Sequence, residues 1–184
     1  MSLDSMLFPY MQPASVAAVP AGSVPRPRLI RRLSEARDAP FVLLVAPAGY
    51  GKTTLLSEWA AADTRRFAWL EPGAGDNDAA HLLRSLRRTA RDSADPTVLV
   101  VDNVHLVTEA ETFAALEDVA RSMPPGSQLA LGARCEPDLP VGSLRAHRRI
   151  FELRTGDLAM TRSEAGALLT GGSACGSEAT GSTP

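Results

Sequence analysis

The segment Ala46–Thr54 constrains the fold of this chain more than any other. It reads Ala-Pro-Ala-Gly-Tyr-Gly-Lys-Thr-Thr, follows the apolar run Phe41–Val45 and precedes the helical pattern Leu55–Ala60. A strand, a loop of small residues with Gly-Lys-Thr, and a helix form the phosphate-binding loop of nucleotide-binding proteins. Small residues let backbone N–H groups surround a phosphate, and the N-terminal end of the helix adds its positive dipole. The segment therefore predicts an α/β fold with a nucleotide site.

Residues of this loop have separate predicted roles. Lys52 reaches the β- and γ-phosphates, and the Thr53 hydroxyl binds Mg²⁺. Lys52 is the only lysine among 19 lysine and arginine residues, so its flexible ammonium group occurs where this chemistry needs it. Ala46 stands where the motif usually has glycine, and the alternative is a glycine-containing turn before an ordinary helix. The predicted nucleotide-binding residues are Pro47, Ala48, Gly49, Tyr50, Gly51, Lys52, Thr53 and Thr54.

Asp102 ends a second apolar segment, Thr97–Asp102, which Pro96 opens. An apolar strand that ends in Asp, downstream of a phosphate loop, matches the second nucleotide motif, whose carboxylate orients Mg²⁺. Many buried strands end in an acid, so this interpretation depends on the loop upstream. We predict that Thr53 and Asp102 together bind the metal ion and that Asp102 is a catalytic residue.

Arg134 ends a further predicted strand, Ser127–Arg134. In open parallel sheets, ligands bind outside the carboxyl ends of the strands, so Lys52, Asp102 and Arg134 are expected at one edge. A guanidinium group there can sense or neutralise the γ-phosphate, which makes Arg134 the second predicted catalytic residue. The alternative is that Arg134 forms a surface ion pair.

Composition limits the remaining classes of function. The chain has 184 residues, of which 45% are hydrophobic and 22% charged, as in a globular protein with one domain. Its net charge of −2 gives no electrostatic case for a nucleic-acid or membrane surface. Cys135 and Cys175 are too few for a disulfide framework and show no metal-ligand spacing, so a cytoplasmic location is expected. No apolar run approaches the length of a membrane span.

Three segments divide the chain. We expect a mobile leader over residues 1–24, a P-loop NTPase domain over 25–170 and a disordered tail over 171–184. A predicted helix over 79–91 carries a row of arginines, which is typical of a solvated face, with a binding patch as the alternative. The last predicted helix, Ala165–Thr170, is so short that the chain looks truncated. The predicted strands are Phe41–Val45, Arg66–Leu70, Thr97–Asp102, Ser127–Arg134 and Arg149–Leu153.

Several segments, in order from about residue 24 to residue 170, resemble one known family. It is the ATPase domain of the large MalT-like, LuxR-type transcriptional regulators, which belong to the STAND class of signal-transduction ATPases. No segment except the loop is diagnostic alone, and the combination is specific. The matching segments are Val24–Leu29, Ala46–Thr54 with Trp59, Trp69 and Leu70 with Asp76–Asp78, Val98–His105, Pro124–Gly126, Gly132–Arg134 and Glu152–Thr161.

The resemblance implies a three-layer P-loop NTPase sandwich with a parallel five-stranded sheet. The implied strand order is 5-1-4-3-2, counting strands along the chain. It also implies a switch domain that binds ATP or ADP with Mg²⁺, and it leaves self-association in the ATP state open. Family members further carry a winged-helix module, a repeat-built sensor and a helix-turn-helix. This chain has no room for them, so we expect no specific DNA binding by the chain alone, and no membrane partner.

Two departures from the family affect the expected chemistry. The connection between the helix over 79–91 and the Asp102 strand looks shorter than in relatives. Asn103 stands where relatives commonly have a second acid, so weak or no hydrolysis is expected. Two alternatives stay open: a small self-standing P-loop ATPase or kinase, and a degenerate remnant that binds nothing.

Overall fold

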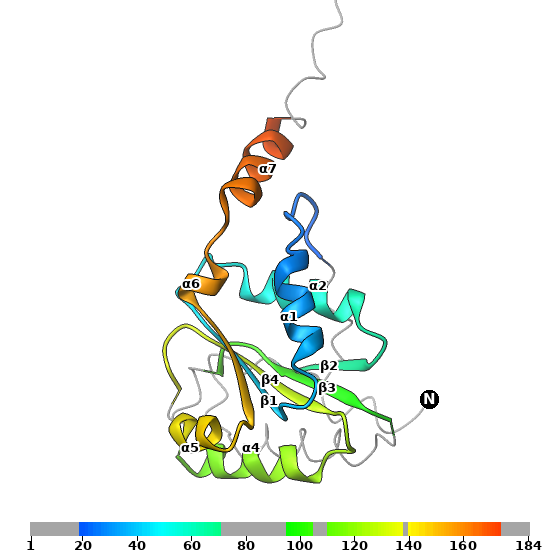
Figure 1. The fold of residues 1–184 in the computed structure, drawn as a ribbon, viewed down its shortest axis with the longest axis vertical. Coiled ribbons are helices and arrows are strands. Elements are labelled where there is room, and N and C mark those ends of the chain that lie inside the picture. The colour runs from blue at the N-terminus through cyan, green and yellow to red at the C-terminus, as the bar shows by residue number, and fades with distance from the viewer. Residues whose placement is uncertain (1–18, 71–94, 105–109, 138–139, 174–184) are drawn as a thin grey trace, which may run out of the picture.

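The computed structural model describes residues 19–70, 95–104, 110–137 and 140–173, and its centre is a parallel five-stranded sheet (Figure 1). The strand order β2-β3-β4-β1-β5 is the predicted order read from the other edge, so the predicted topology is confirmed. The strands are β1 (Phe41–Val45), β2 (Arg66–Leu70), β3 (Thr97–Val101), β4 (Gln128–Ala133) and β5 (Ile150–Arg154).

Helices cover both faces of the sheet, which gives the predicted three layers (Figure 1). One layer holds α1 (Pro27–Glu35) and α2 (Lys52–Ala62), and the other holds α4 (Ala110–Ser122) and α5 (Val141–Ala146). The short helix α6 (Thr155–Leu158), which the sequence did not predict, follows β5 directly. The predicted helix over 79–91 lies outside the described residues.

Side chains of alternate strand residues pack into two separate cores. Val42 and Leu44 of β1 pack with α1 and α2, whereas Phe41 and Leu43 pack with α4 and α5. All five residues of β1 are buried, and the same holds for β3. Burial on both faces explains why these strands read as continuous apolar runs instead of alternating ones. Among the described residues, no helix has both the length and the apolar character that a membrane span needs.

The last helix, α7 (Arg162–Ser173), is longer at both ends than the predicted Ala165–Thr170. It begins early because Thr161 and Glu164 form a capping box: the Glu164 N–H donates to the Thr161 hydroxyl over 3.2 Å, and the Thr161 N–H donates to the Glu164 carboxylate over 2.8 Å. In Figure 1, α7 projects away from the sheet.

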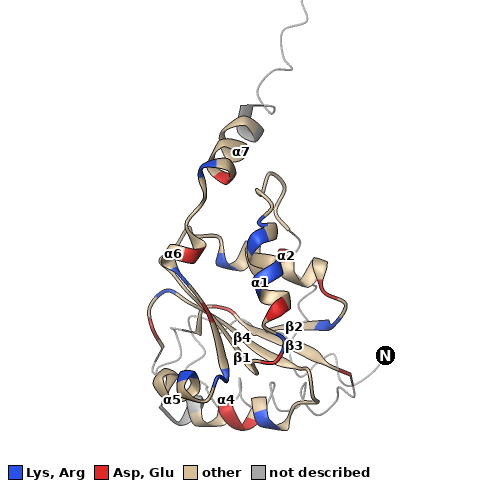
Figure 2. Cartoon of the chain, viewed as in Figure 1, with Lys and Arg blue, Asp and Glu red and all other residues tan. Residues whose placement is uncertain are grey.

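Three arginines of the N-terminal segment attach α6 and the start of α7 to α1. Arg28 donates from Nε to Glu164 over 2.9 Å, and Arg32 donates to Asp157 over 2.7 Å. Arg26, which is 4% exposed, donates to the Leu158 carbonyl over 2.6 Å. Figure 2 shows the basic segments on α1 and charged segments on α6 and at the start of α7. We call Arg26, Arg28 and Arg32 the arginine clasp.

Acid is expected to weaken this clasp. The hydrogen bond from Arg28 is the main cause that lowers the pKa of Glu164 from 4.5 to about 2. Because the folded state binds the proton less well than the unfolded state, Glu164 contributes its full stabilisation above about pH 4.5 and loses it as the pH falls to about 2. Denaturant unfolding of the wild type and Glu164→Gln between pH 6 and pH 2 measures this. We expect the difference in unfolding free energy between the wild type and Glu164→Gln to become smaller as the pH falls. A difference that stays constant with pH would show that the Glu164 carboxylate does not stabilise the clasp.

Candidate functional site

The loop between β1 and α2 bends at two glycines. Gly49 has φ 85°, and Gly51, which caps α2, has φ 72° and ψ 29°. These left-handed values disfavour any residue with a Cβ atom, so both positions need glycine for the backbone path. A Cβ built on Gly49 meets nothing within 4 Å, which leaves conformation as the reason for glycine there. The exposed residues Pro47 and Ala48 form the outer part of the loop.

The Lys52 side chain is buried inside this loop. Its Nζ donates to the Ala46 carbonyl over 2.6 Å and to the Pro47 carbonyl over 2.9 Å, and the residue is 8% exposed. Burial is the main cause that lowers the pKa of the ammonium group; the nearby charge of Asp102 opposes this shift, and that of Arg134 adds to it. The charge is therefore held beneath the exposed residues of the loop, at the end of β1.

Thr53 and Asp102 meet although 49 positions separate them. The Thr53 hydroxyl donates to Asp102 Oδ2 over 2.5 Å, and the backbone N–H of Asn103 donates to Asp102 Oδ1 over 2.9 Å. Asp102 is 2% exposed at the end of β3, whereas Thr53 is exposed in the first turn of α2. The structure thus brings the two predicted metal ligands into direct contact, and their metal-binding role stays a prediction.

Gly132 of β4 has no side chain, and the Asp102 carboxylate occupies the space that a side chain at position 132 would fill. A Cβ on Gly132 would lie 2.3 Å from Asp102 Oδ1 and 3.3 Å from Asp102 Cγ. Any larger residue there would displace the carboxylate or the strand. No such role was predicted for Gly132 from the sequence. The available signal was a glycine inside an apolar strand, which often marks a close approach.

Replacing Gly132 by alanine is expected to displace Asp102 and to lower the free energy of unfolding by about 1–3 kcal/mol, the usual cost of overpacking. Gly142→Ala is the matched control, because a Cβ on Gly142 of α5 meets nothing within 4 Å. Alanine in a helix should be neutral or stabilising there. Chemical denaturation of both variants measures the difference. Equal stability of the two would contradict the close approach.

Arg134 lies just beyond β4 and is exposed. It makes no hydrogen bond or ion pair with any residue that the structure describes, and its charge acts on Lys52. Within the described residues, the alternative of a surface ion pair is therefore not observed. A backbone hydrogen bond of 3.2 Å from Ala46 to Ala133 joins the two segments that carry Lys52 and Arg134.

Two other predicted loop residues, Tyr50 and Thr54, are half-buried. Tyr50 is half-buried, packs against the core on the α1 and α2 side, and accepts a hydrogen bond of 3.4 Å on its carbonyl from Arg26. Thr54 is half-buried in the first turn of α2. The burial of Arg26 was not predicted, because nothing in its local sequence pattern marks a buried arginine.

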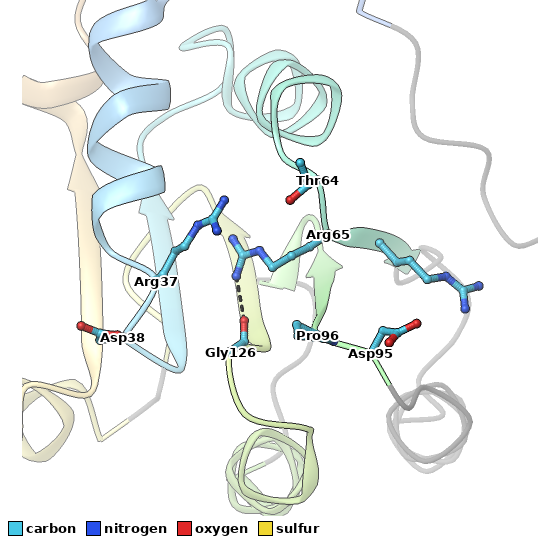
Figure 3. A pocket seen from close by; sticks show the side chains of 8 residues that line it. Arg37, Asp38, Thr64, Arg65, Asp95, Pro96 and Gly126 are labelled. Carbon is cyan, nitrogen blue, oxygen red and sulfur yellow. Dashed lines mark hydrogen bonds between the residues drawn. The ribbon is translucent and has the colours of Figure 1, made fainter.

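A separate hollow of about 490 Å³ lies at the amino ends of the strands (Figure 3). Figure 3 shows Arg37 and Arg65 pointing toward one another, with Arg65 bonded to the Gly126 carbonyl over 2.9 Å. Both arginines also pair with Asp63, over 3.4 Å and 2.8 Å. Both guanidinium groups thus have a carboxylate partner within the protein. We therefore interpret this group of charged residues as structural. The lining residues are Arg37, Asp38, Thr64, Arg65, Arg66, Asp95, Pro96 and Gly126.

Comparison with known proteins confirms the resemblance to MalT-like regulators. The HTH-type transcriptional regulator MalT of Cronobacter sakazakii is 29% identical over 78% of this chain, and that of Klebsiella pneumoniae is 28% identical over the same share. The chain spans 20% of the length of these relatives. No family model matches the chain.

The solved structures that match the chain are more distant from it. The structure of Rhizobiales Trip13 is 16% identical with a TM-score of 0.42, and the match covers 66% of this chain and 48% of that one. The structure of C. elegans PCH-2 is 18% identical with a TM-score of 0.45, and the match covers 70% of this chain and 40% of that one.

Proposed function

We propose that this chain binds ATP or ADP with Mg²⁺ through the loop Ala46–Thr54, as the nucleotide switch domain of a MalT-like regulator, with weak or no hydrolysis. The observation that carries the proposal is the meeting of three groups at the carboxyl edge of the sheet. These groups are the buried ammonium of Lys52, the hydroxyl of Thr53 and the carboxylate of Asp102. Lys52 and Thr53 come from the loop and Asp102 comes from the end of a separate strand, so two independently predicted segments meet here. The similarity to MalT supports the same interpretation.

The residues present fit a magnesium nucleotide. Mg²⁺ binds oxygen ligands, usually one or two from the protein with phosphates and water completing the shell. Thr53 and Asp102 supply a hydroxyl and a carboxylate oxygen that already lie within 2.5 Å of each other. When bound, the metal ion would neutralise phosphate charge and help to orient the phosphates.

The loop supplies the phosphate contacts in this proposal. Gly49 and Gly51 have the left-handed backbone that lets a loop direct successive N–H groups inward. The first N–H groups of α2 have no helical acceptor and carry the positive end of the helix dipole. Lys52 would exchange its two loop carbonyls for phosphate oxygens, and Arg134 would respond to the γ-phosphate.

Regulatory functions of the longer relatives are not assigned to this chain by itself. MalT is named as an HTH-type transcriptional regulator, and the chain matches 20% of its length. We propose that the chain contributes the nucleotide switch and, alone, binds no specific DNA.

A nucleotide titration of the wild type tests the proposal. Thermal unfolding with ADP or ATP should show a saturable rise in the melting temperature in Mg²⁺ and a smaller one in EDTA. An unchanged melting temperature at millimolar nucleotide would refute binding. Rapid turnover in an acceptor screen would favour the self-standing enzyme instead of the switch.

A further inference from the structure

Arg154 links two strands that lie on opposite sides of the loop-bearing strand. It ends β5 and pairs in register with Val45, the last residue of β1. Its guanidinium donates to both oxygens of Glu136, over 3.0 Å and 3.1 Å. Glu136 belongs to the segment that leaves β4, on the other side of β1. The ion pair therefore spans the end of β1, where the chain enters the candidate phosphate loop.

A second carboxylate fixes the other edge of the Arg154 guanidinium. The Arg154 Nε donates to Glu152 over 2.9 Å. Glu152 also accepts two hydrogen bonds from Arg145 of α5, over 2.5 Å and 2.8 Å. A single exposed ion pair contributes little, but a bidentate pair within a network of four charges restricts the planar guanidinium. The hydrogen bond from Arg154 is also the main cause that lowers the pKa of Glu136.

The segment held in this way contains Arg134, two residues before Glu136. The Arg134 side chain is exposed and has no hydrogen-bond or ion-pair partner among the described residues, so the position of its backbone sets the region that the guanidinium can reach. That backbone is fixed on one side by the bond from Ala46 to Ala133 over 3.2 Å. On the other side it is held by Glu136, which accepts two hydrogen bonds from Arg154 and forms a longer ion pair of 3.6 Å with Arg145.

We infer that Arg154 is a positioning residue that holds Arg134 at the nucleotide site through Glu136, and so sets the preference for ATP over ADP. The inference rests on the proposed function, because Arg134 distinguishes the two nucleotides only through the γ-phosphate. Losing one charged hydrogen bond typically weakens binding about tenfold or more. We therefore expect Arg154→Ala and Glu136→Gln each to lower the ratio of ATP to ADP affinity about tenfold, with ADP affinity unchanged.

The experiment is calorimetric titration of the full chain with Mg-ADP and with a nonhydrolysable Mg-ATP analogue. Its variants are Arg154→Ala, Arg154→Lys, Glu136→Gln, Arg134→Ala and the double variant Arg134→Ala with Arg154→Ala. Arg154→Lys should resemble Arg154→Ala, since lysine lacks the bidentate geometry. Arg121→Ala is the matched control, because Arg121 is an exposed arginine on α4 that also pairs with two carboxylates.

The decisive result is the double variant. If Arg154 acts through Arg134, removing Arg154 from the Arg134→Ala background should leave the affinity ratio unchanged. An equal loss of ATP and ADP affinity in Arg154→Ala, a wild-type ratio in Glu136→Gln, or a further loss in the double variant would overturn the inference. Failure of the wild type to bind either nucleotide would instead overturn the proposed function itself.

Discussion

Replacing Lys52 by methionine is expected to abolish the stabilisation of this chain by Mg-ATP and Mg-ADP. For the wild type, nucleotide at a hundred times Kd should add about 2.7 kcal/mol to the free energy of unfolding. The variant should gain nothing at the same concentration, because its loop keeps the backbone but lacks the buried ammonium beneath it. Thermal or denaturant unfolding with and without nucleotide measures both values.

Methionine is the preferred substitution because it keeps the apolar stem of the side chain. In the absence of nucleotide, the variant loses the two hydrogen bonds to Ala46 and Pro47 but is also relieved of a buried charge. These two effects oppose each other, so the variant should fold. Arg121→Met, on the exposed surface of α4, should respond to nucleotide as the wild type does. A normal nucleotide response in Lys52→Met would show that the phosphates bind elsewhere.

The second large effect concerns turnover, which we expect to be very slow or absent in the wild type. Asn103 follows the predicted magnesium ligand, and an amide cannot accept a proton from water at neutral pH. A missing general base typically costs about 10²–10⁴-fold in rate, whereas binding depends on Lys52 and Thr53 and should survive. We expect Asn103→Asp to raise the single-turnover rate by up to that factor.

The backbone at residue 103 suits this substitution. Asn103 has φ 58°, and aspartate is among the few residues that share the tolerance of asparagine for left-handed values. Asp102→Ala is the companion variant and should remove the metal-dependent part of any activity. Wild-type turnover of several per second, with Asn103→Asp no faster, would place the base elsewhere. Glu71, Asp76 and Asp78, which follow β2 in the sequence, carry carboxylates that could replace such a base, and they lie outside the described residues.

The features that could be predicted from sequence are those with a local signal. The loop Ala46–Thr54 can be recognised from the spacing of its glycines and the Gly-Lys-Thr sequence. The strand β1 can be recognised from an unbroken apolar run, which occurs because both of its faces are buried. The strand order came from the family resemblance instead of from the pattern of any single segment. Asp102 could be placed near Thr53 because parallel strands direct their carboxyl ends to the same edge.

The features that could not be predicted depend on pairs of distant residues. Gly132 is required only because Asp102 of a neighbouring strand fills its space. Arg154 and Glu136 form an ion pair across the end of β1. Arg26 donates to carbonyl groups that lie 132 and 133 positions away in the sequence. With 18 arginines on the chain, no local pattern tells which of them is buried or which carboxylate each one selects.

The arginine clasp also gives α7 a second connection to the rest of the molecule, besides its backbone link to β5 through α6. α7 projects from the body, and Glu164 near its start is bonded to Arg28 and paired with Arg26 (Figure 1). The Arg26 backbone N–H donates in turn to Glu58 of α2 over 3.1 Å, and α2 begins at the phosphate loop. Through these contacts α7 is connected to α2, in addition to its backbone connection to β5 through α6. A displacement of α7 would then act on the helix that follows the proposed nucleotide-binding loop as well as on the sheet.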